Sequence, residues 1–177
     1  MIPPRPRHGE IVLFLSAAVL AIACSLVPFD LGGGVAPDVL ASLVAAWVFL
    51  GVALPPLPVL AVIGLVADVF SSRPIGLGAL GLVVAAGLLE RMRATSSGTP
   101  FLLKWIAFAV LWAGILAAQF LILALFLIDG PRPIDLARYW LSTVLFFHIV
   151  LGTLHVVRHG WRGVAGRWKG GHREAAR

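Results

Sequence analysis

The residues of this sequence that could do chemistry are gathered in one polar segment, "GLVADVFSSRPIGLGALG", at residues 64–81 between two apolar runs. Asp68 lies near the end of the first run, and Arg73 and Pro74 follow it closely. An aspartate and an arginine on either side of a turn can form an ion pair, while Pro74 and Gly76 permit a tight turn and close helix packing. The segment therefore predicts a helical hairpin clamped by Asp68 and Arg73.

Two other interpretations of Asp68 and Arg73 remain open. Both residues can lie at a membrane surface with their charged ends in water, or they can take part in moving a proton or a substrate. Ionisable groups at membrane depth are costly and mark functional sites by default, so we favour the clamp. A nucleotide loop is excluded, because the segment has no glycine-rich phosphate motif followed by a lysine.

Gln119 and His148 are the other polar side chains that the sequence places deep in apolar runs. If the last two runs form antiparallel helices, both residues fall at a similar depth, and a hydrogen bond between them would contribute about 0.6 kcal/mol. The alternative is that each side chain faces a different helix. His148 and His155 share a helix face, but two histidines without a nearby carboxylate or thiolate make a poor metal site. We expect no metal and no other cofactor.

The remaining polar residues predict structural roles. Asp38 follows Pro37 where the second apolar run begins, which suits a helix-start residue that interacts favourably with the helix dipole. Serines inside the runs usually bond to the preceding turn or to a neighbouring helix; they include Ser16, Ser25 and Ser42. Because no nucleophile and base can be paired, we expect that the protein is not an enzyme.

The elements that must position these residues are apolar throughout. The chain has 177 residues, of which 60% are hydrophobic and 12% charged, against roughly 45–50% and about 25% in soluble domains. This composition predicts an all-α, polytopic membrane protein with about six transmembrane helices. The runs cover residues 11–29, 39–54, 58–70, 75–89, 104–128 and 136–157. A full crossing takes about 20 residues, so the short third and fourth runs need tilt, local thinning of the bilayer or protein neighbours.

The distribution of charge predicts the topology. With both termini in the cytoplasm, eleven of the 14 lysines and arginines lie on the inner side, and only Arg73, Arg132 and Arg138 lie outside. Five spans would place the two basic ends on opposite sides, against the positive-inside rule. A re-entrant hairpin formed by the third and fourth runs remains an alternative, because it leaves four spans and the same orientation.

Three regions follow from this topology. Residues 1–10 form a cytoplasmic amino terminus, residues 11–157 form one membrane domain, and residues 158–177 form a basic cytoplasmic tail. We expect the tail to bind anionic lipid, with a docking strip for a cytoplasmic protein as the alternative. The basic residues lie beside apolar segments, so nucleic acid is not needed to explain the net charge of +6.

The segment at residues 36–93 resembles the bacterial rod-shape-determining protein MreD family. The resemblance is carried by Pro37-Asp38, by "GLVAD" at residues 64–68 and by "PIGLGAL" at residues 74–80. The short length and the apolar spans agree over almost the whole chain. The family often carries an asparagine where this chain has Gly78.

The resemblance implies a non-catalytic subunit of the cell-wall elongation machinery in the bacterial inner membrane. Its expected partner is MreC, and through MreC the protein is linked to MreB, RodA and a class B penicillin-binding protein. The implied fold is that of the substrate-binding S components of energy-coupling-factor transporters. The residues that match the family pattern are Pro37, Asp38, Gly64, Asp68, Gly76 and Leu77. We expect Asp68 and Gly76 to shape the surface that a partner contacts.

A second function class stays open beside this one. The short spans and glycine-rich turns also suit a small-molecule-binding S component of a vitamin or metal importer, although few polar residues lie within the spans. A membrane enzyme that acts on lipid-linked precursors would need a catalytic set of side chains, and the sequence offers none.

Overall fold

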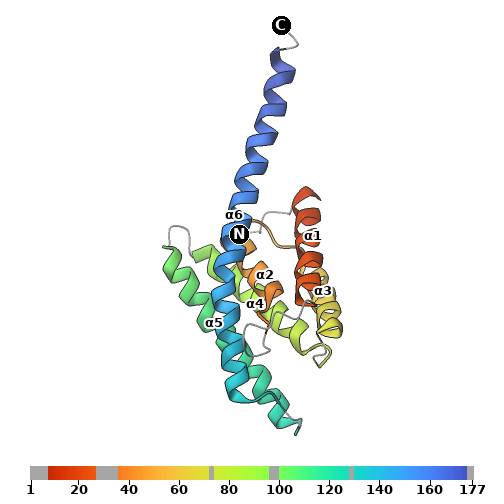
Figure 1. Cartoon of the computed structure of the whole chain (residues 1–177), viewed down its shortest axis with the longest axis vertical. Helices are drawn as coiled ribbons and strands as arrows, with labels where there is room; N and C mark the ends of the chain where they lie inside the picture. The colour runs from red at the N-terminus through yellow and green to blue at the C-terminus, as the bar shows by residue number, and fades with distance from the viewer. Residues whose placement is uncertain (1–7, 27–35, 72–73, 96–99, 128–129, 175–177) are drawn as a thin grey trace.

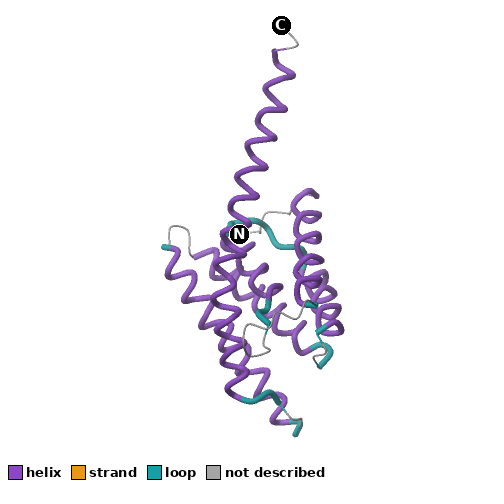
Figure 2. The backbone as a smooth tube through the Cα atoms, viewed as in Figure 1, coloured by secondary structure: helices purple, strands orange, loops and turns teal. Residues whose placement is uncertain are grey.

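The computed structural model describes residues 8–26, 36–71, 74–95, 100–127 and 130–174. These ranges contain helices and connecting loops, as Figure 2 shows. The helices are α1 (His8–Ser25), α2 (Val39–Phe49), α3 (Leu57–Phe70), α4 (Leu77–Thr95), α5 (Phe101–Leu125) and α6 (Pro133–Glu174). The prediction of an all-helical fold is therefore confirmed, and each predicted apolar run contains the greater part of one helix.

Helix α2 lies in the middle of the bundle, in contact with α1, α4 and α6 (Figure 1). Its nine residues from Leu40 to Val48 are all buried. The helix has 11 residues and is about 16 Å long, roughly half the thickness of the hydrocarbon core of a bilayer. It ends well before Leu54, where the second apolar run ends, because Gly51 turns the chain with a φ of +72°. The helix is therefore shorter than the predicted span.

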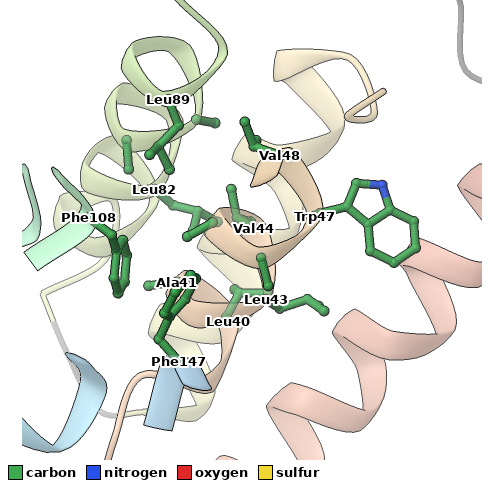
Figure 3. Close-up of a cluster of buried hydrophobic side chains, with 14 of the residues drawn as sticks. Leu40, Ala41, Leu43, Val44, Trp47, Val48, Leu82, Leu89, Phe108 and Phe147 are labelled. Atoms are coloured by element: carbon green, nitrogen blue, oxygen red, sulfur yellow. The ribbon is translucent and has the colours of Figure 1, made fainter. Parts of the chain in front are cut away.

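Large side chains from five helices surround α2 and form the core. The ring of Phe14 on α1 packs edge-on against Trp47, with centroids 5.2 Å apart. On the other side, Phe108 of α5 and Phe147 of α6 stack with centroids 4.8 Å apart. Figure 3 shows Trp47 pointing away from the group that Phe108 and Phe147 form. Since such pairs contribute about 0.5–1.5 kcal/mol beyond their buried area, the first holds α1 to α2 and the second holds α5 to α6.

Helices α5 and α6 are the two in the described part of the chain that are long and apolar enough to cross a membrane by length and composition. The qualifying segments, Phe101–Leu125 and Pro133–Val157, have 25 residues each. Many of their apolar side chains point away from the bundle and are exposed; they include Val110, Leu121, Leu125, Leu145 and Ile149.

Helix α6 continues without a break from the bundle to Glu174. Its carboxyl-terminal part extends beyond the other helices (Figure 1). The boundary that the sequence suggests after Val157 is therefore a change in composition inside one helix of 42 residues.

Candidate functional site

The hairpin formed by α3 and α4 is fastened by Asp68, in the last turn of α3. Its carboxylate oxygen Oδ2 accepts hydrogen bonds from the backbone N–H groups of Gly76, at 2.9 Å, and Ala79, at 3.0 Å. These groups lie at the amino-terminal end of α4, where N–H groups lack intrahelical partners and the helix dipole favours a negative charge. Asp68 therefore caps a helix other than its own. Arg73, the predicted ion-pair partner, lies outside the described residues.

Three glycines permit this arrangement. Gly76 has a φ of +93°, a conformation that other residues rarely adopt. A side chain at Gly78 would collide with the Asp68 carboxylate. At Gly64, an added Cβ would lie 2.7 Å from the Cα of Ala79, so α3 and α4 are in backbone contact there. The roles of Gly64 and Gly76 agree with the predicted close packing and tight turn, whereas the role of Gly78 was missed.

The beginning of α4 is also tied to α5. The side-chain amide Nε2 of Gln119 donates to the carbonyl oxygen of Leu77 at 3.0 Å. Gly81 provides the room, because a Cβ there would collide with the Gln119 amide. Pro74 lies at the tip of the hairpin, where its carbonyl accepts the Leu77 N–H at 3.1 Å. Four of the residues singled out from the sequence thus meet at one hairpin: Asp68, Pro74, Gly76 and Leu77.

The hydrogen bond predicted between Gln119 and His148 is wrong. The His148 ring instead packs edge-on against Phe101 and Trp105, with centroids 5.3 Å and 5.1 Å away. The two indole hydrogen bonds that join α5 to α6, from Trp105 to Val144 and from Trp140 to Ala109, set the register.

This register separates the two side chains along the bundle. Gln119 lies ten residues beyond Ala109 on α5, about 15 Å towards the α5–α6 loop, whereas His148 lies eight residues from Trp140, about 12 Å in the opposite direction. The prediction that the two residues lie at a similar depth failed because Gln119 is six residues from the end of α5, while His148 is fifteen residues from the start of α6.

Asp38 joins α2 to α6. Its Oδ1 accepts the Ala41 N–H at 2.9 Å, so Asp38 is the N-cap of α2, as its position after Pro37 predicts. The Tyr139 hydroxyl donates to the other carboxylate oxygen, and the Asp38 N–H donates to the Thr143 hydroxyl oxygen at 3.0 Å. Tyr139 and Thr143 were missed from the sequence. The sequence signal that could have identified Tyr139 is that it is the only tyrosine of the chain, a single aromatic hydroxyl in an apolar run.

The serines named from the sequence make the two kinds of bond expected of them. The hydroxyls of Ser16 and Ser25 donate to carbonyls in their own helix, those of Leu13 and Ile22. The Ser42 hydroxyl, which is buried, donates across to the Thr143 carbonyl on α6 at 3.3 Å. This last contact adds a third hydrogen bond between the α2 region and α6.

Asp38 and Asp68 line the same small chamber, which has a volume of about 50 Å³. All six helices contribute to its wall. Its polar lining residues include Gln119, Tyr139 and Trp112 as well as the two aspartates. We call this cavity the acidic chamber. The sequence-predicted residues that meet there are Pro37, Asp38, Gly64, Asp68 and Gln119; His148 does not line it.

A larger cleft of about 370 Å³ adjoins the acidic chamber. Gly78, Gln119 and Tyr139 line both spaces. The rest of the cleft is mostly apolar, with walls from the hairpin, the end of α5, the loop before α6 and the start of α6. The apolar residues are Pro74, Leu77, Leu116, Phe120, Leu123, Pro131 and Leu136. We call this space the apolar cleft.

The acidic chamber offers hydrogen-bond donors and acceptors, which suits binding of a small polar group. Among the residues that the structure describes, no three histidines, cysteines, aspartates or glutamates are grouped in a way that could hold a metal ion. Comparisons of the chain with protein-family models, with curated proteins and with solved structures find no match.

Proposed function

We propose that this chain is an MreD-type subunit, a non-catalytic scaffold of the cell-wall elongation complex in the bacterial inner membrane that binds MreC. One observation carries the proposal. The residues that resemble the MreD pattern form two groups, at residues 37–38 and 64–77, and members of both groups line the acidic chamber: Pro37, Asp38, Gly64 and Asp68. Asp68 fastens the hairpin through Gly76 and Ala79, and Asp38 fastens α2 to α6.

We also propose that the bundle lies in the membrane with six helices, both termini in the cytoplasm and the fold of an S component. The apolar length of α5 and α6 supports this, as do the exposed apolar side chains along them. The distribution of lysine and arginine supports the orientation. The short α2 is buried among other helices, so it does not have to meet lipid along its length.

The tip of the hairpin is the surface that we assign to MreC. Three large apolar side chains there are exposed: Val69 by 60%, Phe70 by 53% and Ile75 by 73%. Because Asp68 holds the backbone behind them, they form a fixed apolar surface, and such surfaces are typical of protein–protein contact. MreB, RodA and a class B penicillin-binding protein would be reached through MreC. The basic tail at residues 158–177 would bind anionic lipid.

Substitution at the hairpin tip tests this assignment. Ile75→Glu is expected to reduce the amount of MreC that copurifies from native membranes by at least about tenfold, because a charge placed in a desolvated contact is costly. Asp68→Leu is expected to reduce it as well, by loosening the hairpin. The measurement is the ratio of MreC to this chain in the purified material, so that changes in expression cancel.

Leu102→Glu is the matched control. Leu102 is 60% exposed in the first turn of α5, at the other end of α4 from the hairpin tip. It receives the same charge without touching the proposed surface and should retain MreC. Recovery of MreC at the parental ratio with Ile75→Glu, in protein of unchanged thermal stability, would show that MreC does not bind the hairpin tip.

The acidic chamber supports a second candidate function, that of a small-molecule-binding S component. Polar groups from several helices converge on it, which is typical of ligand sites. Native mass spectrometry of gently purified protein separates the two functions. A retained vitamin-sized molecule favours the importer component, whereas stoichiometric MreC favours the scaffold.

A further inference from the structure

We propose that the acidic chamber and the apolar cleft together bind one amphiphile, whose small head carries a primary ammonium and a neighbouring hydroxyl and whose apolar body occupies the cleft. The proposal is independent of MreC binding. It follows from two polar atoms in the chamber wall, an indole N–H and a carboxylate oxygen, that have no hydrogen-bond partner among the described residues, and from the apolar space next to them.

The first of these atoms is Oδ1 of Asp68. The residue is only 3% exposed, and both backbone N–H groups that bind its carboxylate donate to Oδ2. Among the described residues, none donates a hydrogen bond to Oδ1 and none forms an ion pair with Asp68. Buried carboxylates are normally paired with a cation or fully hydrogen-bonded. A ligand with a cationic N–H group would supply both a positive charge for the Asp68 carboxylate and a hydrogen-bond donor for its Oδ1.

The second atom is Nε1 of Trp112. Trp112 is 3% exposed, and no described residue forms a hydrogen bond with its indole N–H. An indole N–H is a donor only, so it needs an acceptor oxygen. An ammonium group has no acceptor, but a hydroxyl beside the ammonium accepts from the indole and still donates to a carboxylate. An amino-alcohol head therefore satisfies Trp112 and Asp68 together.

Charge and size restrict the ligand further. Two carboxylates, those of Asp38 and Asp68, line the chamber, so an anionic head would be repelled. The chamber volume of about 50 Å³ admits a head of a few non-hydrogen atoms. The adjoining cleft of about 370 Å³ falls in the range of ligand pockets. Leu116, Phe120 and Leu123 give it an apolar lining, which suits an alkyl chain.

Isothermal titration calorimetry of the full chain in detergent micelles tests the proposal. The probe is sphinganine, which has a primary ammonium, a neighbouring hydroxyl and an alkyl chain. We expect it to bind at one site per chain and at least about tenfold more tightly than its N,N,N-trimethyl derivative, which has no N–H donors. Myristate, with an anionic head, should not bind there. Ethanolamine, which has the head without the apolar body, should bind at least about tenfold more weakly than sphinganine.

Two variants assign the binding to the chamber. Trp112→Phe removes the indole N–H and keeps an aromatic ring, and it should weaken sphinganine binding at least about tenfold. Trp47→Phe is the matched control, because that indole is equally buried and bonds the Ala53 carbonyl away from the chamber, and it should leave the affinity unchanged. Asp68→Asn removes the charge and keeps an acceptor oxygen, and it should weaken sphinganine binding by a similar factor.

Several results would overturn the proposal. Equal affinity of sphinganine for the parent and Trp112→Phe proteins would exclude the chamber as the site of the head. Tight binding of myristate would show that the two carboxylates do not select a cationic head. Ethanolamine binding as tightly as sphinganine would show that the apolar cleft does not contribute to binding and that the ligand is a small free amine. The expected result is different: Trp112→Phe weakens sphinganine binding while MreC is recovered at the parental ratio, which distinguishes this proposal from MreC binding.

Discussion

Replacing Asp68 with alanine is expected to destabilise the purified protein by about 2–4 kcal/mol. The carboxylate accepts hydrogen bonds from the N–H groups of Gly76 and Ala79, and the bond to Ala79 is buried. Alanine leaves both donors without a partner at the end of α4, and an unsatisfied buried donor costs about 1–3 kcal/mol. The measurement is thermal or denaturant-induced unfolding in detergent, with hydrogen exchange at Gly76 and Ala79 as a local readout.

Two controls separate this capping role from a general effect of charge. Asp68→Asn keeps an acceptor oxygen at the same place and should recover most of the stability. Asp135→Ala removes a partly exposed carboxylate that lies 3.9 Å from the Arg138 guanidinium within one turn of α6. Such a pair contributes little, so a change of no more than about 0.5 kcal/mol is expected. If Asp68→Ala unfolds like Asp135→Ala, Asp68 does not hold the hairpin.

Replacing Gly64 with alanine is the second change with a large expected effect, a destabilisation of about 1–3 kcal/mol. The added Cβ would lie 2.7 Å from the Cα of Ala79 and 3.0 Å from its Cβ. Backbone cannot move aside as a flexible side chain can, so α3 and α4 must separate. Because Asp68 lies on α3 and the N–H groups that it accepts lie at the start of α4, the separation also lengthens these hydrogen bonds. The unfolding measurement is the same as for Asp68.

Gly87→Ala is the matched control for Gly64→Ala. Gly87 also lies in a helix, α4, but a Cβ there would meet no atom within 4 Å. Alanine has a higher helix propensity than glycine, so this variant should gain up to about 1 kcal/mol. We therefore expect the free energy of unfolding to fall in Gly64→Ala and to rise in Gly87→Ala. A stabilised Gly64→Ala protein would mean that the hairpin is not closely packed.

The candidate site was predictable where its contacts are local. Asp38 binds the N–H of Ala41, three residues away, so the cap of α2 follows from the sequence around it. The turn at Gly76 and the close packing at Gly64 likewise follow from residue type. Longer contacts were not predictable in this way: Asp68 accepts the N–H of Ala79, which the sequence did not suggest, and Gln119 reaches Leu77 instead of His148.

The sequence by itself determined that the chain is helical, where its helices begin and which of their residues turn or cap, because these properties depend on neighbours within one turn. Only the tertiary structure decided that Asp38, Asp68, Gln119 and Trp112 share one chamber, and that α2 is a short central helix. The physical reason is that the helices are apolar on nearly every side. Such helices have little periodicity to mark the inward face, so register and burial are set by packing between distant residues such as Trp47, Phe108 and Phe147.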